Sequence, residues 1–99
     1  MAEQVQQAQA KEEDVIYIGK KPLMSYVLAV ITQFGAGNKQ VRIKARGRAI
    51  SRAIDVANIV MRRFVNDAKI KAINVGSEEK INQQGKKTYV STIEIVLAK

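Results

Sequence analysis

Residues 40–52 read QVRIKARGRAISR, and the spacing of apolar residues changes inside this stretch. From Val41 to Arg46, apolar and basic residues alternate, which is the two-residue period of a half-buried strand. After Gly47, apolar residues recur as far as Phe64 with the 3.6-residue period of a helix. The stretch therefore predicts a strand that ends at a glycine turn and leads directly into an amphipathic helix.

The flanking sequence predicts the remaining elements of an α/β fold. Residues 15–18 form a short apolar run, typical of a strand buried on both faces, and Pro22 suits the first turn of a helix that ends near Gly35. Residues 70–75 predict a strand with an imperfect alternation or a bulge, and residues 88–97 predict another strand. The polar residues 78–87 between them predict a long, basic-tipped hairpin arm.

The order βαβαββ predicts a two-layer sandwich, in which a four-stranded mixed sheet carries two helices on one face. The length of 99 residues indicates one domain, which we place at residues 14–99, after a disordered acidic and Gln-rich tail at residues 1–13.

Composition excludes several kinds of protein. The chain has no cysteine and no histidine, which removes the commonest catalytic and zinc-binding side chains, so we expect no catalytic residues, no metal and no cofactor. No apolar run is long enough to span a bilayer, and the N-terminus lacks the apolar centre of a signal peptide. We therefore expect a soluble cytoplasmic protein that does not contact membranes.

The charge is concentrated in the predicted domain. The net charge is +8, but residues 1–14 hold one lysine and four acids, so residues 15–99 alone carry +11. A field of this sign attracts polyanions. The charge therefore favours nucleic acid as a partner, and solubility alone is the alternative explanation, because every protein surface needs charge.

The cations around Gly47 are the sharper signal. Arg42, Lys44 and Arg46 share one face of the predicted strand, and Arg48 and Arg52 fall in the first turns of the next helix, where a cation is unfavourable. A phosphate placed there would accept hydrogen bonds from backbone N–H groups and guanidinium forks together. The alternative is that acids elsewhere in the fold, such as Asp55 or Glu94, neutralise the cations, of which Lys39 is a sixth.

Two further segments extend this basic surface. Lys20 and Lys21 stand at the equivalent place before the first helix, and a βαβ layout makes the two places neighbours. The arm adds lysines and amides that suit the edges of a minor groove, or it is simply a soluble loop. The predicted nucleic-acid-binding residues are Lys20, Lys21, Arg42, Lys44, Arg46, Arg48, Arg52, Asn82, Gln83, Gln84, Lys86 and Lys87.

What the sequence lacks narrows the mode of recognition. Aromatic residues do not alternate with the basic ones, so base stacking is not expected to dominate, and contacts should be mainly to phosphates, with weak sequence preference. A nuclease would need clustered carboxylates, but the acids of the domain lie on different predicted elements. We therefore predict a binding protein and not an enzyme.

Several motifs together resemble a known family. The blocks IGKKP at residues 18–22, YVL at 26–28, IKARGRAIS at 43–51, VGS at 75–77 and VSTIEI at 90–95 are similar to those of archaeal Alba proteins. The resemblance covers about residues 14–98. It implies a small chromatin protein of the archaeal nucleoid, with a fold similar to the C-terminal domain of translation initiation factor three.

The resemblance also implies roles for individual residues. Lys20 and Lys21 match the DNA-contacting lysine pair of the family, at which acetylation is said to weaken binding, with Lys20 the expected site. Arg46 and Arg48 match its central basic contacts, and Phe64 matches an apolar position used between dimers. The family forms homodimers and higher assemblies of dimers, and a paralogue is an alternative partner in a heterodimer.

The leading hypothesis is thus a dimeric, sequence-tolerant protein that coats, compacts or bridges double-stranded DNA. Structured RNA is the alternative ligand, because the same basic surface would also suit an A-form helix.

Overall fold

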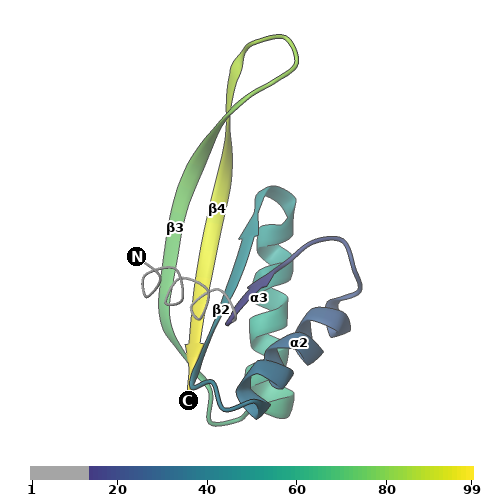
Figure 1. Cartoon of the computed structure of the whole chain (residues 1–99), viewed down its shortest axis with the longest axis vertical. Helices are drawn as coiled ribbons and strands as arrows, with labels where there is room; N and C mark the ends of the chain where they lie inside the picture. Colours follow the sequence, from purple (N-terminus) through teal and green to yellow (C-terminus); the bar gives the residue numbers. More distant parts are fainter. Residues whose placement is uncertain (1–13) are drawn as a thin grey trace, which may run out of the picture.

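The computed structural model describes residues 14–99, and the predicted tail lies outside them. Two helices pack on one face of a four-stranded sheet (Figure 1). The sheet order is β1-β2-β4-β3, in which β1 is parallel to β2 and the other neighbours are antiparallel. The predicted βαβαββ sandwich is therefore confirmed. The strands and helices are β1 (Val15–Tyr17), α2 (Leu23–Gly35), β2 (Gln40–Arg46), α3 (Ile50–Ile59), β3 (Lys69–Ile81) and β4 (Lys87–Ala98).

The core lies between the helices and the middle of the sheet. The alternate residues of β2 that the sequence assigned to one face, Val41 and Ile43, are fully buried, and Ile95 and Leu97 of β4 pair beside them. From the helices, the fully buried side chains are Val27 and Val30 of α2, Ala53 and Val56 of α3, and Val60. Within residues 14–99, no helix packs on the opposite face of the sheet, and we call it the open face (Figure 1).

The open face explains one wrong prediction. Residues 15–18 were expected to be buried on both faces, but Tyr17 is 67% exposed while Ile18 is buried. Tyr17 pairs in register with Lys44, so its side chain shares the open face with that lysine. An apolar run at the edge of a sheet therefore did not indicate burial on both sides.

The second helical region is less regular than its sequence pattern. A 3-10 turn, η1 (Gly47–Ala49), precedes α3, and a π-helical turn, η2 (Val60–Phe64), follows it. Gly47 has a φ of 58°, a left-handed conformation that glycine adopts without strain, and this turn directs the chain from β2 into the helix. The glycine turn predicted between strand and helix is thus confirmed.

The hairpin arm is a continuation of β3 and β4 (Figure 1). The pairing of β2 with β4 ends at Arg46↔Thr92, whereas the pairing of β3 with β4 continues as far as Ile81↔Lys87. Half of the predicted polar loop, residues 78–81 and 87, is therefore strand, and these residues are exposed because both faces of the arm meet solvent. The predicted irregularity in β3 is confirmed as a register shift between Ile70 and Ala72.

Candidate nucleic-acid interface

The loop between β1 and α2 carries Lys20 and Lys21 and is held by hydrogen bonds. The Tyr26 hydroxyl accepts hydrogen bonds from the backbone N–H of Gly19 at 2.9 Å and of Lys21 at 3.0 Å. Tyr26 is only 9% exposed and belongs to the core, so its ring is fixed by packing. A Cβ added to Gly19 would lie 3.1 Å from the Tyr26 hydroxyl oxygen, which explains the glycine at this close approach.

Arg52 joins the same loop to α3. Its Nε donates to the Gly19 carbonyl at 3.1 Å, and its Nη2 donates to the Lys21 carbonyl. The ends of β1 and β2 also meet, because the Ile18 N–H donates to the Lys44 carbonyl at 2.9 Å. The two basic segments that the βαβ layout was expected to bring together are therefore neighbours.

Three cations at these helix starts have no carboxylate partner within residues 14–99. Lys20, Lys21 and Arg48 are exposed and form no ion pair there; we call them the loop cluster. Neither α2 nor the η1–α3 segment has an acidic residue in its first turn or a side-chain cap. The partial positive charge of each helix start thus adds to the cations.

The strand cations behave differently. Arg42 lies 3.2 Å from Asp14 and 3.5 Å from Glu94, and Lys44 lies 3.8 Å from the same Glu94 carboxylate. Glu94 pairs in register with Lys44, and all of these side chains are partly buried on the open face. The expectation that the strand cations are uncompensated is therefore wrong for Arg42 and Lys44, and the alternative that named Glu94 is correct for them.

Two further corrections concern the ends of β2. Arg46 forms an ion pair with Glu78 at the base of the arm, with 2.9 Å between Nη1 and Oε1. Lys39 directly precedes β2, at the end opposite Arg46, and its carbonyl accepts a hydrogen bond from the Lys99 N–H. The sequence could not indicate these partners, because they come from strand register between distant segments.

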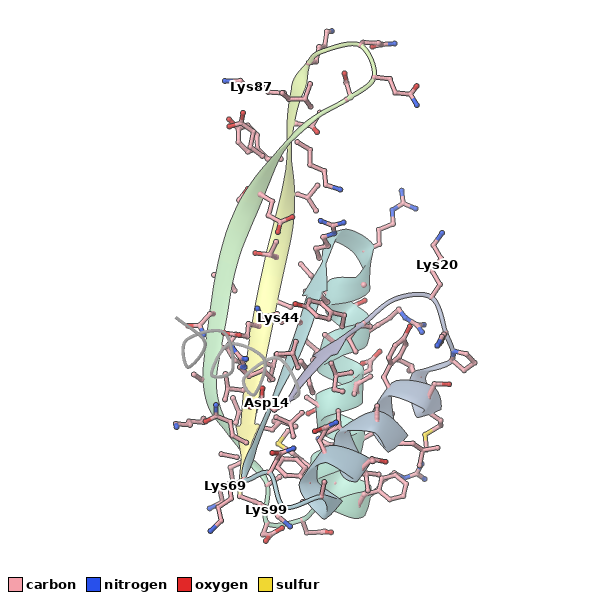
Figure 2. All side chains as sticks on the ribbon, viewed as in Figure 1. Asp14, Lys20, Lys44, Lys69, Lys87 and Lys99 are labelled. Carbon is pink, nitrogen blue, oxygen red and sulfur yellow. The ribbon has the colours of Figure 1, made fainter. Side chains whose placement is uncertain are left out.

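The arm carries polar side chains outward from the domain. Figure 2 shows Lys87 near the arm tip, well away from Lys20 on its loop. Asn82 shapes the turn, because its Oδ1 accepts hydrogen bonds from the backbone N–H of Gln84 and Lys86, each at 2.9 Å. Gln83, Gln84 and Lys86 are exposed, and Lys87 is paired with Glu79 at 3.6 Å. Groove contacts by these side chains stay a prediction.

A shallow hollow of about 700 Å³ lies on the open face. It is bordered by Tyr17, Lys44, Arg46, Glu78 and Glu94, and Asn74 donates to Glu94 at 2.8 Å. The cations around the hollow are neutralised by its own acids. We therefore expect the hollow to attract an anion less strongly than the loop cluster does. Phe64, which the resemblance assigned to contacts between dimers, is 46% exposed in η2, and that role stays a prediction.

Sequence reasoning missed Tyr26 as part of this site. It falls in the apolar stripe of the first helix, and the sequence gives no sign that its hydroxyl reaches back to the preceding loop. Within residues 14–99, no group of three or more acidic side chains could hold a metal ion. No helix in the same range has the length and apolar character needed to cross a bilayer.

The fold and site define a small basic α/β domain with a two-stranded arm and a cationic loop at its helix starts. The sequence signature of the Alba family matches residues 14–77, and the chain belongs to this family. The membership confirms the resemblance and the prediction of a non-enzymatic protein.

Individual relatives agree with this assignment. The chain is 56% identical over 88 residues to the DNA/RNA-binding protein Alba of Methanothrix thermoacetophila, covering 89% of this chain and 98% of that one. It is 54% identical over 86 residues to the protein of the same name from Methanocella arvoryzae, covering 87% and 90% of the two chains. Among solved structures, Alba from Thermoplasma volcanium matches with a TM-score of 0.81 and 46% identity, covering 86% of this chain and 99% of that chain.

Proposed function

We propose that this protein binds double-stranded DNA with little sequence preference and coats, compacts or bridges chromosomal DNA in an archaeal cell. The observation that carries the proposal is the loop cluster, in which Lys20, Lys21 and Arg48 lack carboxylate partners within the described chain beside two uncapped helix starts. Repulsion between the cations destabilises such a site, and a bound polyanion relieves this repulsion. The relatives named as DNA/RNA-binding proteins support the same ligand class.

In this proposal, phosphates contact the loop cluster first and the arm second. Arg46 and Lys87 are exposed enough to exchange their carboxylate partners for phosphates, since exposed ion pairs contribute little. Arg42 and Lys44 contribute less, because they already share Asp14 and Glu94 on the open face. The arm tip, with Gln83, Gln84 and Lys86, reaches into a neighbouring minor groove.

The proposed binding unit is a homodimer, and an uncovered apolar row on β3 supports it. Ile73 and Val75 pair in register with Ile95 and Ile93, which the helices bury to 1% and 9% exposure. Ile73 and Val75 themselves are 52% and 78% exposed, because the helices pack over β1, β2 and β4. A second copy laid on this row would remove the apolar surface from water.

The salt dependence of DNA affinity tests the proposal. If a dimer neutralises roughly 6–10 phosphates, log K should fall against log salt with a slope of about −5 to −9. Replacing Lys20 and Lys21 with alanine should weaken binding about equally for duplexes of different sequence and make the slope less steep. A slope near zero for the unchanged protein would exclude this mechanism.

Structured RNA is the second candidate ligand, and it is favoured by the names of the relatives, which are DNA/RNA-binding proteins. The proposed contacts of the loop cluster are to phosphates and not to the sugar, so the phosphates of an A-form helix would suit it as well. Competition between a DNA duplex and an RNA duplex of equal length and matched sequence, at one salt concentration, separates the two candidates.

A further inference from the structure

We propose that Tyr26 and Arg52 are positioning residues that hold the Gly19–Lys21 loop in the conformation in which Lys20 and Lys21 contact phosphate. The inference rests on the proposed function, because it concerns the same lysines. It assigns Arg52 to the loop backbone and makes Tyr26, which lies in the core, a determinant of affinity.

The two side chains bind different polar groups of the same short backbone segment, one its N–H groups and the other its carbonyl groups. The Tyr26 hydroxyl accepts from the N–H groups of Gly19 and Lys21, while the Arg52 guanidinium donates to the carbonyl groups of the same two residues. The peptide groups before and after Lys20 are therefore both fixed, one through the Gly19 carbonyl and the other through the Lys21 N–H. One support comes from α2 and the other from α3, so the loop is held against both helices.

We call these four hydrogen bonds to the loop backbone the clamp, and its surroundings favour tyrosine and arginine at these two positions. Gly19 leaves room for the hydroxyl, since any Cβ there would lie 3.1 Å from the Tyr26 oxygen. Arg52 is half-buried and makes no ion pair within residues 14–99, and both of its hydrogen bonds to described residues go to this loop. The forked guanidinium suits two carbonyls at once, which a lysine ammonium on its flexible stem does not.

The expected benefit is a loop that is ordered before the nucleic acid arrives. Lys20 and Lys21 are adjacent like charges, and a free loop would spread them apart and would lose conformational freedom on binding. Because the clamp fixes the backbone, only the two exposed side chains remain to be ordered. Removing the clamp should therefore weaken affinity without changing how many phosphates are neutralised.

The test is a double-mutant cycle on duplex DNA affinity. Tyr26→Phe keeps the ring and removes the acceptor, and it should weaken binding about three- to tenfold, the range expected for lost hydrogen bonds. The slope of log K against log salt should stay that of the unchanged protein, because no cation is removed. In a Lys20→Ala/Lys21→Ala background, Tyr26→Phe should have no further effect, which is non-additivity that a general loss of stability would not produce.

Two matched controls and a measurement without nucleic acid sharpen the test. Tyr17→Phe alters a 67% exposed tyrosine on the open face, outside the loop cluster and the arm, and should leave affinity unchanged. Arg52→Lys keeps the charge but loses the fork, and it should weaken binding, whereas Arg63→Lys at the other end of the helical segment should not. In the free protein, Tyr26→Phe should speed amide hydrogen exchange at Gly19 and Lys21.

The outcomes separate this inference from the proposed function. If Lys20→Ala/Lys21→Ala binds as tightly as the unchanged protein, the proposed use of the loop cluster fails. If that variant is weakened but Tyr26→Phe and Arg52→Lys bind normally, the positioning role is overturned and the proposed function stands. Equal weakening by Tyr26→Phe in both backgrounds also overturns the positioning role, because the effect then does not pass through the lysines.

Discussion

Arg46 and Glu78 form an ion pair that joins the end of β2 to the base of the arm, with 2.9 Å between Nη1 and Oε1. Both side chains are more than half exposed, so the pair contributes little to stability. We expect a larger effect on binding, because Glu78 places a negative charge beside a residue proposed to contact phosphate.

Glu78→Gln should strengthen binding to duplex DNA. The change frees Arg46 and removes one acid, so the slope of log K against log salt should become more negative by about 1 per subunit. The measurement is affinity by titration at several salt concentrations. Asp67→Asn removes the same charge in the turn before β3 and serves as the control, since a gain of equal size there would show that net charge alone is responsible.

Glu94→Gln should destabilise the domain. It removes the carboxylate shared by Arg42 and Lys44, which lie on neighbouring positions of the partly buried open face. We expect a loss of about 1 kcal/mol in the free energy of unfolding, measured with urea. Glu79→Gln breaks the exposed pair with Lys87 and should change stability by less than about 0.5 kcal/mol. Equal effects of the two changes would contradict the difference in burial.

Asn82→Ala should weaken DNA binding although no charge changes. The Asn82 Oδ1 accepts two backbone hydrogen bonds in the turn, and their loss should leave the arm tip less ordered before binding. Faster amide exchange at Gln84 and Lys86, with an unchanged midpoint of global unfolding, would be the expected result. Gln83→Ala is the matched change in the same turn, and it should leave the exchange rates alone.

Val75→Asp should abolish the proposed dimer. Val75 is 78% exposed on the helix side of β3, so the change costs little in the isolated subunit but would bury a charge in an interface. Sedimentation should give a dimer for the unchanged protein and a monomer for the variant. Tyr17→Asp, on the open face, should leave the mass unchanged. A dimer that persists in Val75→Asp would place the interface elsewhere.

Much of the fold was predictable because periodicity is a local property. The alternation of residues 41–46 and the helical spacing after Gly47 fixed strand, turn and helix, and the structure places each accordingly. The extent of the arm was less predictable, since residues 76–80 have no apolar side chain on either face and resemble a loop in sequence. These residues form a strand because they pair with β4, and a local sequence pattern does not reveal pairing partners.

The candidate site divides in the same way. The exposed loop cluster was correctly placed at the two helix starts, because βαβ topology alone requires that neighbourhood. Glu94 was named from the sequence as a partner of the strand cations, but the pairs of Arg42 with Asp14 and of Arg46 with Glu78 were not predictable, since these acids lie 28 and 32 residues away along the chain. Tyr26 was missed because its aromatic ring satisfies the apolar pattern and hides the role of its hydroxyl.

Beyond Glu78↔Val90, both faces of the arm are exposed to solvent, and the arm contributes nothing to the core. Its length is therefore free to vary during evolution without loss of folding. Because side chains alternate between faces, insertions that keep every side chain on its face come in steps of two residues per strand, or about 6.6 Å. The distance that the arm spans along a duplex would then change in discrete increments, without any change in the phosphate contacts proposed for the loop cluster.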